Sequence, residues 1–278
     1  MRCARLNLSP LGETANRMRE KRGKVQAVMN QILLITDGCS NVGENPVTAA
    51  AQAQAEGIAV NVIGVVDEGT IGEQGAREIG EIAQAGGGMS RIVSTGQLSR
   101  TMQMMTRQTV AGTIRQAVNQ ELKQLFGLES VGALPPSRRA EVVRVMDEME
   151  EMAELRVALL IDTSASMKPK LRAVEDAIRD LSLSLKARTG DSAVAVLHYP
   201  GSNSRIPCVI DSDWTTDADR LPRLFARLRM QGATPTGPAI VAAVDYFRET
   251  CGKIKAELAE ISQLTATETG EARSDYVV

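Results

Sequence analysis

Two short apolar runs, each ending in an aspartate, constrain the fold of this chain most strongly. Residues 155–161, LRVALLI, precede Asp162, and residues 31–36, QILLIT, precede Asp37. Runs of this kind are typical of strands that are buried on both faces, as in a parallel sheet. Within residues 168–187 the apolar positions recur every three or four residues, so the period changes from strand to helix soon after Asp162. The pattern predicts a strand, a polar turn and then a helix.

The same alternation of strand and helix extends over most of the chain. Strands are predicted at 31–36, 58–66, 91–94, 155–161, 192–199 and 206–211, the last two as a hairpin, and helices at 46–56, 74–84, from 98 onward, 168–187, 217–229 and from about 240 to 247. This order predicts an α/β protein with a Rossmann-like open, mostly parallel sheet and helices on both faces. Ligands of such sheets bind at the carboxyl ends of the strands, near the switch point.

Composition excludes several classes of protein. The net charge of -2 and the aromatic content of 3% give no basis for binding nucleic acid. No apolar run reaches the roughly 18 residues of a membrane span, so we expect no membrane association. Four cysteines, Cys3, Cys39, Cys208 and Cys251, show no CxxC spacing, which indicates reduced thiols in a cytoplasmic protein.

Polar residues with oxygen donors gather where the predicted strands end or helices begin. The segment DTSASM supplies Asp162, Ser164 and Ser166, GATPTG supplies Thr234, and LLITDG supplies Asp37. Two carboxylates and three hydroxyls suit magnesium, and also manganese or calcium. Helix capping would explain one residue of DTSASM but not all three, and turn formation is the alternative role for Thr234 and Asp37. We interpret the set as ligands of one divalent cation.

These three segments resemble the metal-ion-dependent adhesion site (MIDAS) of von Willebrand factor type A (VWA) domains. The family pattern is DxSxS, a distal threonine and a distal aspartate, and in the family the strand ending in that aspartate comes last. Here LLITDG precedes DTSASM, so the chain resembles a circularly permuted VWA domain, similar to small intracellular VWA proteins of spore-forming bacteria. Two half domains, each from a separate VWA domain, are the alternative interpretation.

The permuted order implies a division of the chain into five segments. Residues 1–28 are a basic extension outside the fold, 29–126 the C-terminal half of a VWA fold, 127–154 a helical connector, 155–250 the N-terminal half with DxSxS, and 251–278 a polar tail. Neither half supplies both sides of the switch point, so strand 31–36 should lie beside strand 155–161. Pairing of the halves between two chains, in a swapped dimer, is the alternative to pairing within one chain.

The resemblance implies adhesion without catalysis. Ser164 and Ser166 would ligate the ion through their hydroxyls, Thr234 would join directly or through water, and Asp162 and Asp37 would hold the ion directly or through water. One coordination position would remain for a glutamate or aspartate of a partner protein. We therefore expect a divalent-metal-dependent protein-protein interaction module that is not an enzyme.

The alternative function is enzymatic, namely that of a metal-dependent Rossmann-like enzyme that handles phosphate or nucleotides. A phosphatase of the haloacid dehalogenase type has a second aspartate two positions after the first, where this chain has Ser164. Phosphate-loop and GxSxG motifs are absent from the sequence, and the glycines at 85–90 lack GxGxxG spacing. The single histidine, His198, lies in a predicted strand, where a structural role is commoner than catalysis.

Overall fold

A single six-stranded sheet organises the fold in the computed structural model, which describes residues 28–67, 71–201, 206–217 and 233–250. The strands are β1 (Val28–Thr36), β2 (Ile58–Val66), β3 (Gly87–Ser94), β4 (Glu154–Asp162), β5 (Ser192–Tyr199) and β6 (Val209–Thr215). The helices are α2 (Pro46–Ala55), α3 (Glu73–Ala85), α4 (Leu98–Phe126), α5 (Pro136–Met152), α6 (Leu171–Lys186) and a helix at residues 236–250, with short 3₁₀ turns that include η4 (Ala165–Lys170).

The strand order β3-β2-β1-β4-β5-β6 places β1 beside β4 at the centre of the sheet. All neighbouring strands are parallel except β5 and β6, which are antiparallel. Strands from the two parts of the sequence thus form one sheet within one chain, as the sequence analysis expected for β1 and β4. The order reverses between β1 and β4, and this switch point is where an open α/β sheet offers a binding crevice.

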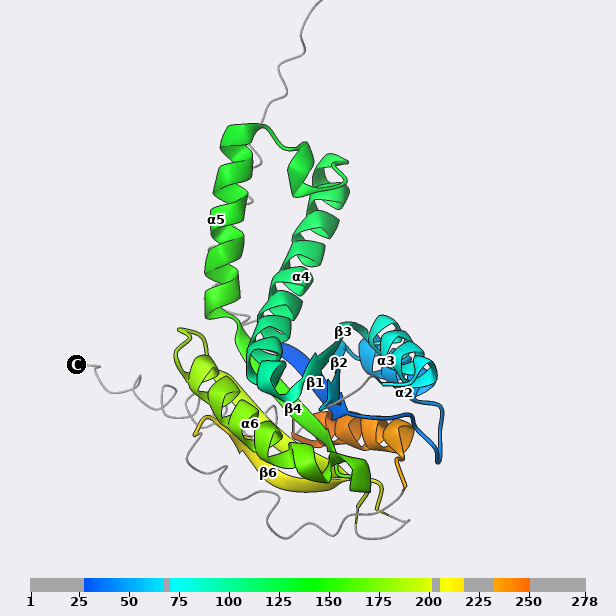
Figure 1. Cartoon of the computed structure of the whole chain (residues 1–278). Coiled ribbons are helices and arrows are strands. Elements are labelled where there is room, and N and C mark those ends of the chain that lie inside the picture. The colour runs from blue at the N-terminus through cyan, green and yellow to red at the C-terminus, as the bar shows by residue number, and fades with distance from the viewer. Residues whose placement is uncertain (1–27, 68–70, 202–205, 218–232, 251–278) are drawn as a thin grey trace, which may run out of the picture.

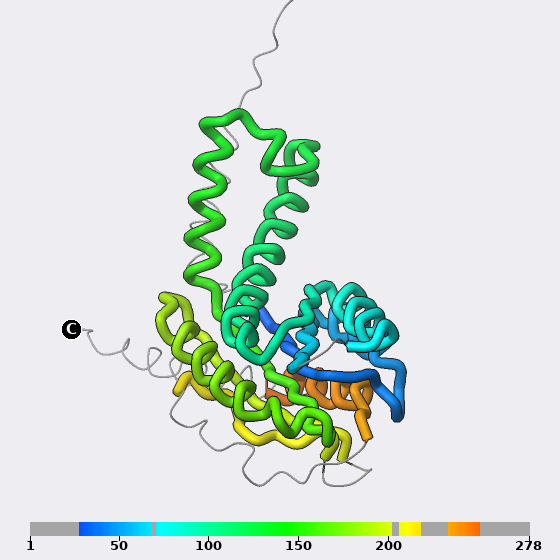
Figure 2. The backbone as a smooth tube through the Cα atoms, in the orientation of Figure 1, coloured from blue at the N-terminus to red at the C-terminus, as the bar shows by residue number. Residues whose placement is uncertain are grey.

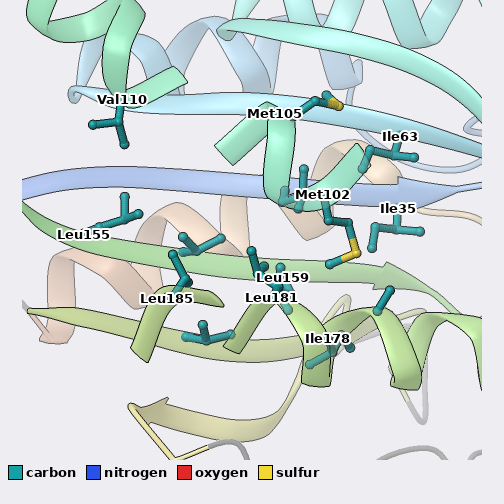
Figure 3. Close-up of a cluster of buried hydrophobic side chains, with 14 of the residues drawn as sticks. Ile35, Ile63, Met102, Met105, Val110, Leu155, Leu159, Ile178, Leu181 and Leu185 are labelled. Carbon is teal, nitrogen blue, oxygen red and sulfur yellow. The ribbon is translucent and has the colours of Figure 1, made fainter. Parts of the chain in front are cut away.

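Helices cover both faces of the sheet, which confirms the predicted α/β, Rossmann-like class (Figure 1). Helices α4 and α6 pack on one face, where Ile35, Leu159 and Met102 are fully buried (Figure 3). Helices α2 and α3 and the helix at 236–250 pack on the other face, around Leu34 and Leu160. Because side chains alternate along a strand, adjacent residues of β1 and β4 contribute to opposite layers of the core. This double coverage fixes the carboxyl ends of the central strands.

Helices α4 and α5 form an antiparallel pair that extends away from the sheet (Figures 1 and 2). The pair includes much of residues 127–154, which were predicted to be a helical connector. Helix α4 buries Met102, Met105, Ile114 and Leu122, whereas Leu125, near its distal end, is 54% exposed.

Several predicted boundaries differ from the structure for identifiable reasons. Strand β3 begins at Gly87, not residue 91, because glycines that pack directly against β2 hide a strand from pattern analysis. The predicted helix at 168–187 begins as the 3₁₀ turn η4, which contains Pro169, and becomes α-helical at Leu171. The predicted extension 1–28, apart from Val28, the tail 251–278 and most of helix 217–229 lie outside the described residues.

Candidate metal centre

The carboxyl ends of β1 and β4 bring two of the predicted site residues to the same edge of the sheet. The parallel register pairs Ile35 with Ile161, so Asp162 lies one residue, and Asp37 two residues, beyond a paired strand position. The two aspartates are separated by 125 residues in sequence, and only the β1–β4 pairing places them together. They lie at the switch point of the sheet, where a ligand site is expected.

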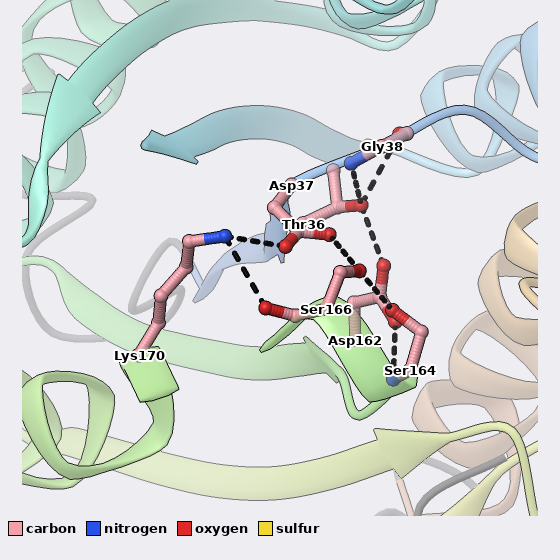
Figure 4. Close-up of polar contacts among 7 residues, drawn as sticks. All are labelled: Thr36, Asp37, Gly38, Asp162, Ser164, Ser166 and Lys170. Atoms are coloured by element: carbon pink, nitrogen blue, oxygen red, sulfur yellow. Dashed lines mark hydrogen bonds and ion pairs between the residues drawn. The ribbon is translucent and has the colours of Figure 1, made fainter. Parts of the chain in front are cut away.

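Asp162 is a fully buried carboxylate held by two hydrogen bonds. Its Oδ2 accepts from the Thr36 hydroxyl at 2.7 Å, and its Oδ1 accepts from the Ser164 backbone N–H at 2.8 Å (Figure 4). Burial raises the pKa of Asp162, these hydrogen bonds oppose that rise, and the nearby charge of Asp37 adds slightly to it. No basic side chain pairs with Asp162 in the part of the chain that the structure describes.

A chain of short polar contacts links the remaining DxSxS residues to Asp37. The Ser164 and Ser166 hydroxyl oxygens are 3.2 Å apart, and the Ser166 hydroxyl donates to Asp37 Oδ1 at 2.8 Å (Figure 4). Ser164 is 6% exposed, whereas Ser166 is exposed. The structure therefore brings four of the five predicted residues, Asp162, Ser164, Ser166 and Asp37, into one cluster.

Thr234 lies in the loop that is tied to the segment after β1. Its backbone N–H donates to Asn41 Oδ1 at 2.8 Å, and its carbonyl accepts from the Asn41 N–H and the Ser40 hydroxyl, both at 3.2 Å. The residue is 6% exposed. These contacts fix the Thr234 backbone at the same edge of the sheet as Asp37, although they do not join its hydroxyl to the four-residue cluster.

The spacing of the donor oxygens fits a small octahedral cation. Neighbouring ligands of Mg²⁺, at about 2.1 Å from the ion, are about 3.0 Å from each other. The Ser164–Ser166 and Ser166–Asp37 oxygen separations, 3.2 and 2.8 Å, bracket that value. Among the described residues no group of three or more His, Cys, Asp or Glu side chains forms a metal site. A cation at this edge would therefore depend on hydroxyl oxygens as well as carboxylates.

Two residues of the cluster were missed by sequence reasoning. Thr36 was predicted only as the end of a buried strand, yet its hydroxyl binds Asp162. Lys170 Nζ lies 2.5 Å from Asp37 Oδ2 and 3.3 Å from the Ser166 carbonyl. The position of Lys170 four residues after Ser166, one helical turn on, is the only signal that could have indicated this contact.

Other residues that the sequence singled out have structural surroundings. Cys39 is a partly buried free thiol whose pKa is raised by burial and by Glu78, which disfavours the reactive thiolate. His198 Nδ1 lies 2.7 Å from Asp211 Oδ2 across the β5–β6 hairpin. Neither residue is hydrogen-bonded to the cluster, so neither adds a donor to it.

Comparisons with known proteins give relatives of similar length and fold. A scan against protein-family models finds no match. The chain is 46% identical over 222 residues to the uncharacterized protein YabS of Bacillus subtilis (strain 168). The matched residues cover 80% of this chain and 90% of that protein. It is 44% identical to an uncharacterized protein of known crystal structure from Alicyclobacillus acidocaldarius, with a TM-score of 0.75 over 82% of this chain and 97% of that one.

The lengths and compositions of the described helices bear on membrane insertion. None of those in the ranges 28–67, 71–201, 206–217 and 233–250 has both the length and the apolar character that crossing a bilayer requires.

Proposed function

This chain belongs to the family of the Bacillus subtilis protein YabS, and we propose that it is a divalent-metal-dependent protein-interaction module with a MIDAS of the VWA type. The observation that carries the proposal is the cluster at the ends of β1 and β4. There a fully buried carboxylate, which has no basic partner among the described residues, lies in a chain of contacts with two serine hydroxyls and a second carboxylate. Burying an unpaired carboxylate is costly, and a bound cation would offset that cost.

The strand order supports the comparison with a permuted VWA domain. The family pattern needs the DxSxS strand and the strand ending in the distal aspartate at one switch point, whatever their order in sequence. Here β4 supplies DxSxS and its neighbour β1 supplies Asp37. The adjacency of these two motifs, which are far apart in the sequence, supports the proposal.

Each residue has a definite task in this proposal. Ser164 and Ser166 would bind Mg²⁺, or Mn²⁺ or Ca²⁺, through their hydroxyl oxygens, and Asp37 would bind through the oxygen that now accepts from Ser166. Asp162 would supply negative charge and hold the Ser164 backbone through its N–H bond. Thr234 would approach from the loop fixed to Asn41. When bound, the ion supplies an open coordination position for a glutamate or aspartate of a partner protein.

Cation binding and chelator-sensitive capture test the proposal together. The full chain should bind Mg²⁺ or Mn²⁺ in calorimetric titrations, and a Ser164→Ala, Ser166→Ala double variant should lose that binding while remaining folded. The parent protein should capture a partner in the presence of Mg²⁺, and both EDTA and the double variant should abolish capture. Undiminished capture by the folded double variant in EDTA would refute metal-bridged binding, and turnover of a phosphate ester would instead favour an enzyme.

A further inference from the structure

Lys170 places a fixed positive charge at the edge of the candidate metal centre. Its ammonium group is 2.5 Å from Asp37 Oδ2, and the side chains of Lys170 and Asp37 are only 11% and 5% exposed. Ion pairs at the open surface are weakened by solvent and salt, but this pair is largely shielded from both. The charge of Lys170 should therefore interact strongly with any ion bound nearby, because solvent screens it little.

The two oxygens of Asp37 have different partners. Oδ1 accepts from the Ser166 hydroxyl at 2.8 Å, on the side of the serine pair, whereas Oδ2 faces the Lys170 ammonium (Figure 4). Asp37 can therefore present Oδ1 to a cation while Oδ2 remains bound to Lys170. The ammonium would then stay beside the occupied site.

We propose that the positive charge of Lys170 sets the affinity of this site for its cation and for an acidic ligand. It weakens binding of the divalent cation and strengthens binding of an acidic group to the cation-loaded site. This inference rests on the proposed function. With Asp37, Asp162 and Lys170 charged, the cluster has a net charge of about -1 before, and about +1 after, a divalent ion binds. Without Lys170 the loaded site would be neutral and would attract a carboxylate less.

A second effect of Lys170 acts in the opposite direction. The ammonium helps to hold Asp37 in one orientation, and losing that restraint should weaken cation binding by only a fewfold, because Ser166 still contacts the same carboxylate. Removing a unit charge within about 5 Å of a divalent ion strengthens cation binding by about tenfold even at the dielectric constant of water. The charge effect is the larger one, so Lys170→Met should bind the cation at least about fivefold more tightly.

Calorimetric titration of the full chain with MnCl₂ tests whether Lys170 weakens binding of the divalent cation. Lys170→Met and Lys170→Gln remove the charge in two ways, so the test survives if one variant fails to fold. Lys168→Met is the matched control, because Lys168 lies in the same η4 turn, is exposed, and forms no ion pair within the described residues. We expect tighter binding in both Lys170 variants and a change of less than twofold in the control.

Acetate binding to the manganese-loaded protein tests whether Lys170 strengthens binding of an acidic ligand to the occupied site. Acetate that replaces water on bound Mn²⁺ lowers the water-proton relaxation rate, which gives an acetate affinity for each variant. The Lys170 variants should bind acetate at least about threefold more weakly than the parent and Lys168→Met, because the charge that attracts the carboxylate is gone. The Ser164→Ala, Ser166→Ala protein provides the blank for Mn²⁺ that is not held at the cluster.

The outcomes separate this inference from the function on which it rests. Equal Mn²⁺ and acetate affinities in the parent and the folded Lys170 variants would overturn the role of Lys170, even if the serine double variant lost Mn²⁺ binding. Weaker Mn²⁺ binding in the Lys170 variants would overturn it too, since orientation would then outweigh charge. Failure of the parent to bind Mn²⁺ at the serine-dependent site would instead overturn the proposed function.

Discussion

Replacing Asp162 with asparagine separates the cost of burying its charge from the value of its hydrogen bonds. The carboxylate is fully buried and accepts from the Thr36 hydroxyl and the Ser164 N–H. Asparagine keeps an acceptor oxygen for Ser164, and its amide can donate to the Thr36 oxygen. Asp162→Asn thus removes a buried charge and retains both contacts. Without metal, we expect its free energy of unfolding to exceed that of the parent by about 1 kcal/mol.

Alanine at the same position should have the opposite effect. Asp162→Ala leaves the Ser164 N–H without its acceptor and the Thr36 hydroxyl with only the longer contact to the Gly38 carbonyl at 3.3 Å, and a buried donor left unpaired costs about 1–3 kcal/mol. Urea unfolding followed by circular dichroism measures both changes. In a domain of this size the gain of about 1 kcal/mol in the asparagine variant corresponds to a rise in Tm of about 2–4 °C.

The difference in free energy of unfolding between Asp162→Asn and the parent should depend on pH, in a direction that follows from the pKa shift of Asp162. Burial raises the pKa of Asp162 in the folded protein, so the folded state binds a proton more readily than the unfolded state. The parent therefore loses stability as pH rises from the normal range of an aspartate through the raised folded pKa. The advantage of Asp162→Asn should be small at acidic pH, grow across that interval and stay constant above it.

Divalent metal should reverse the order of stability of these two proteins. At a free Mn²⁺ concentration of about 100 times Kd, the parent gains about 2.7 kcal/mol, and Asp162→Asn gains much less because it lacks one of the two site charges. The parent should then be the more stable protein. The reasoning is refuted if Asp162→Asn is as unstable as Asp162→Ala in EDTA, or if Mn²⁺ stabilises Asp162→Asn as much as the parent.

Three further predictions concern the rest of the site and the chain. Ser166→Ala should change the free energy of unfolding by less than about 0.5 kcal/mol, because Ser166 is exposed, but should weaken Mn²⁺ binding at least tenfold in calorimetry. Gly237→Ala should lower Tm and weaken Mn²⁺ binding, because a Cβ there would lie 2.0 Å from the Glu44 carbonyl oxygen. The control Gly112→Ala lies at an exposed and open position of α4 and should raise the free energy of unfolding by about 0.5–1 kcal/mol. Equal Tm values for the two variants would contradict this prediction. A chain without residues 1–27 should keep its Tm, and a marked drop would show that this segment contributes to the fold.

The central part of the fold was predictable because its sequence signals are strong and local. Apolar runs ending in Asp37 and Asp162 identified β1 and β4, and the alternation of elements gave a mostly parallel sheet covered on both faces. The need to complete the switch point then predicted the pairing of β1 with β4, which the register shows. By contrast, β3 is a partly exposed edge strand that begins with glycines, so its first half carries no apolar pattern.

The candidate site was only partly predictable, for a physical reason. Asp162, Ser164 and Ser166 lie in one short motif, but Thr36 and Lys170 contribute through contacts that depend on three-dimensional placement. A threonine at the end of a buried strand looks like any β-branched residue, and a lysine in the first turn of a helix looks like a solvated charge. Only the approach of β1 to the turn after β4 gives these two side chains their partners.

Anomalous diffraction from crystals of the full chain grown with Mn²⁺ tests the central claim most directly. The account predicts a manganese peak at the carboxyl ends of β1 and β4, about 2.1 Å from the hydroxyl oxygens of Ser164 and Ser166, with Asp37 Oδ1 directly bound or one water away. The same crystals of the Ser164→Ala, Ser166→Ala protein should lack the peak. A fully occupied peak elsewhere, or none at this edge at saturating Mn²⁺, would contradict a metal-dependent adhesion site in this protein.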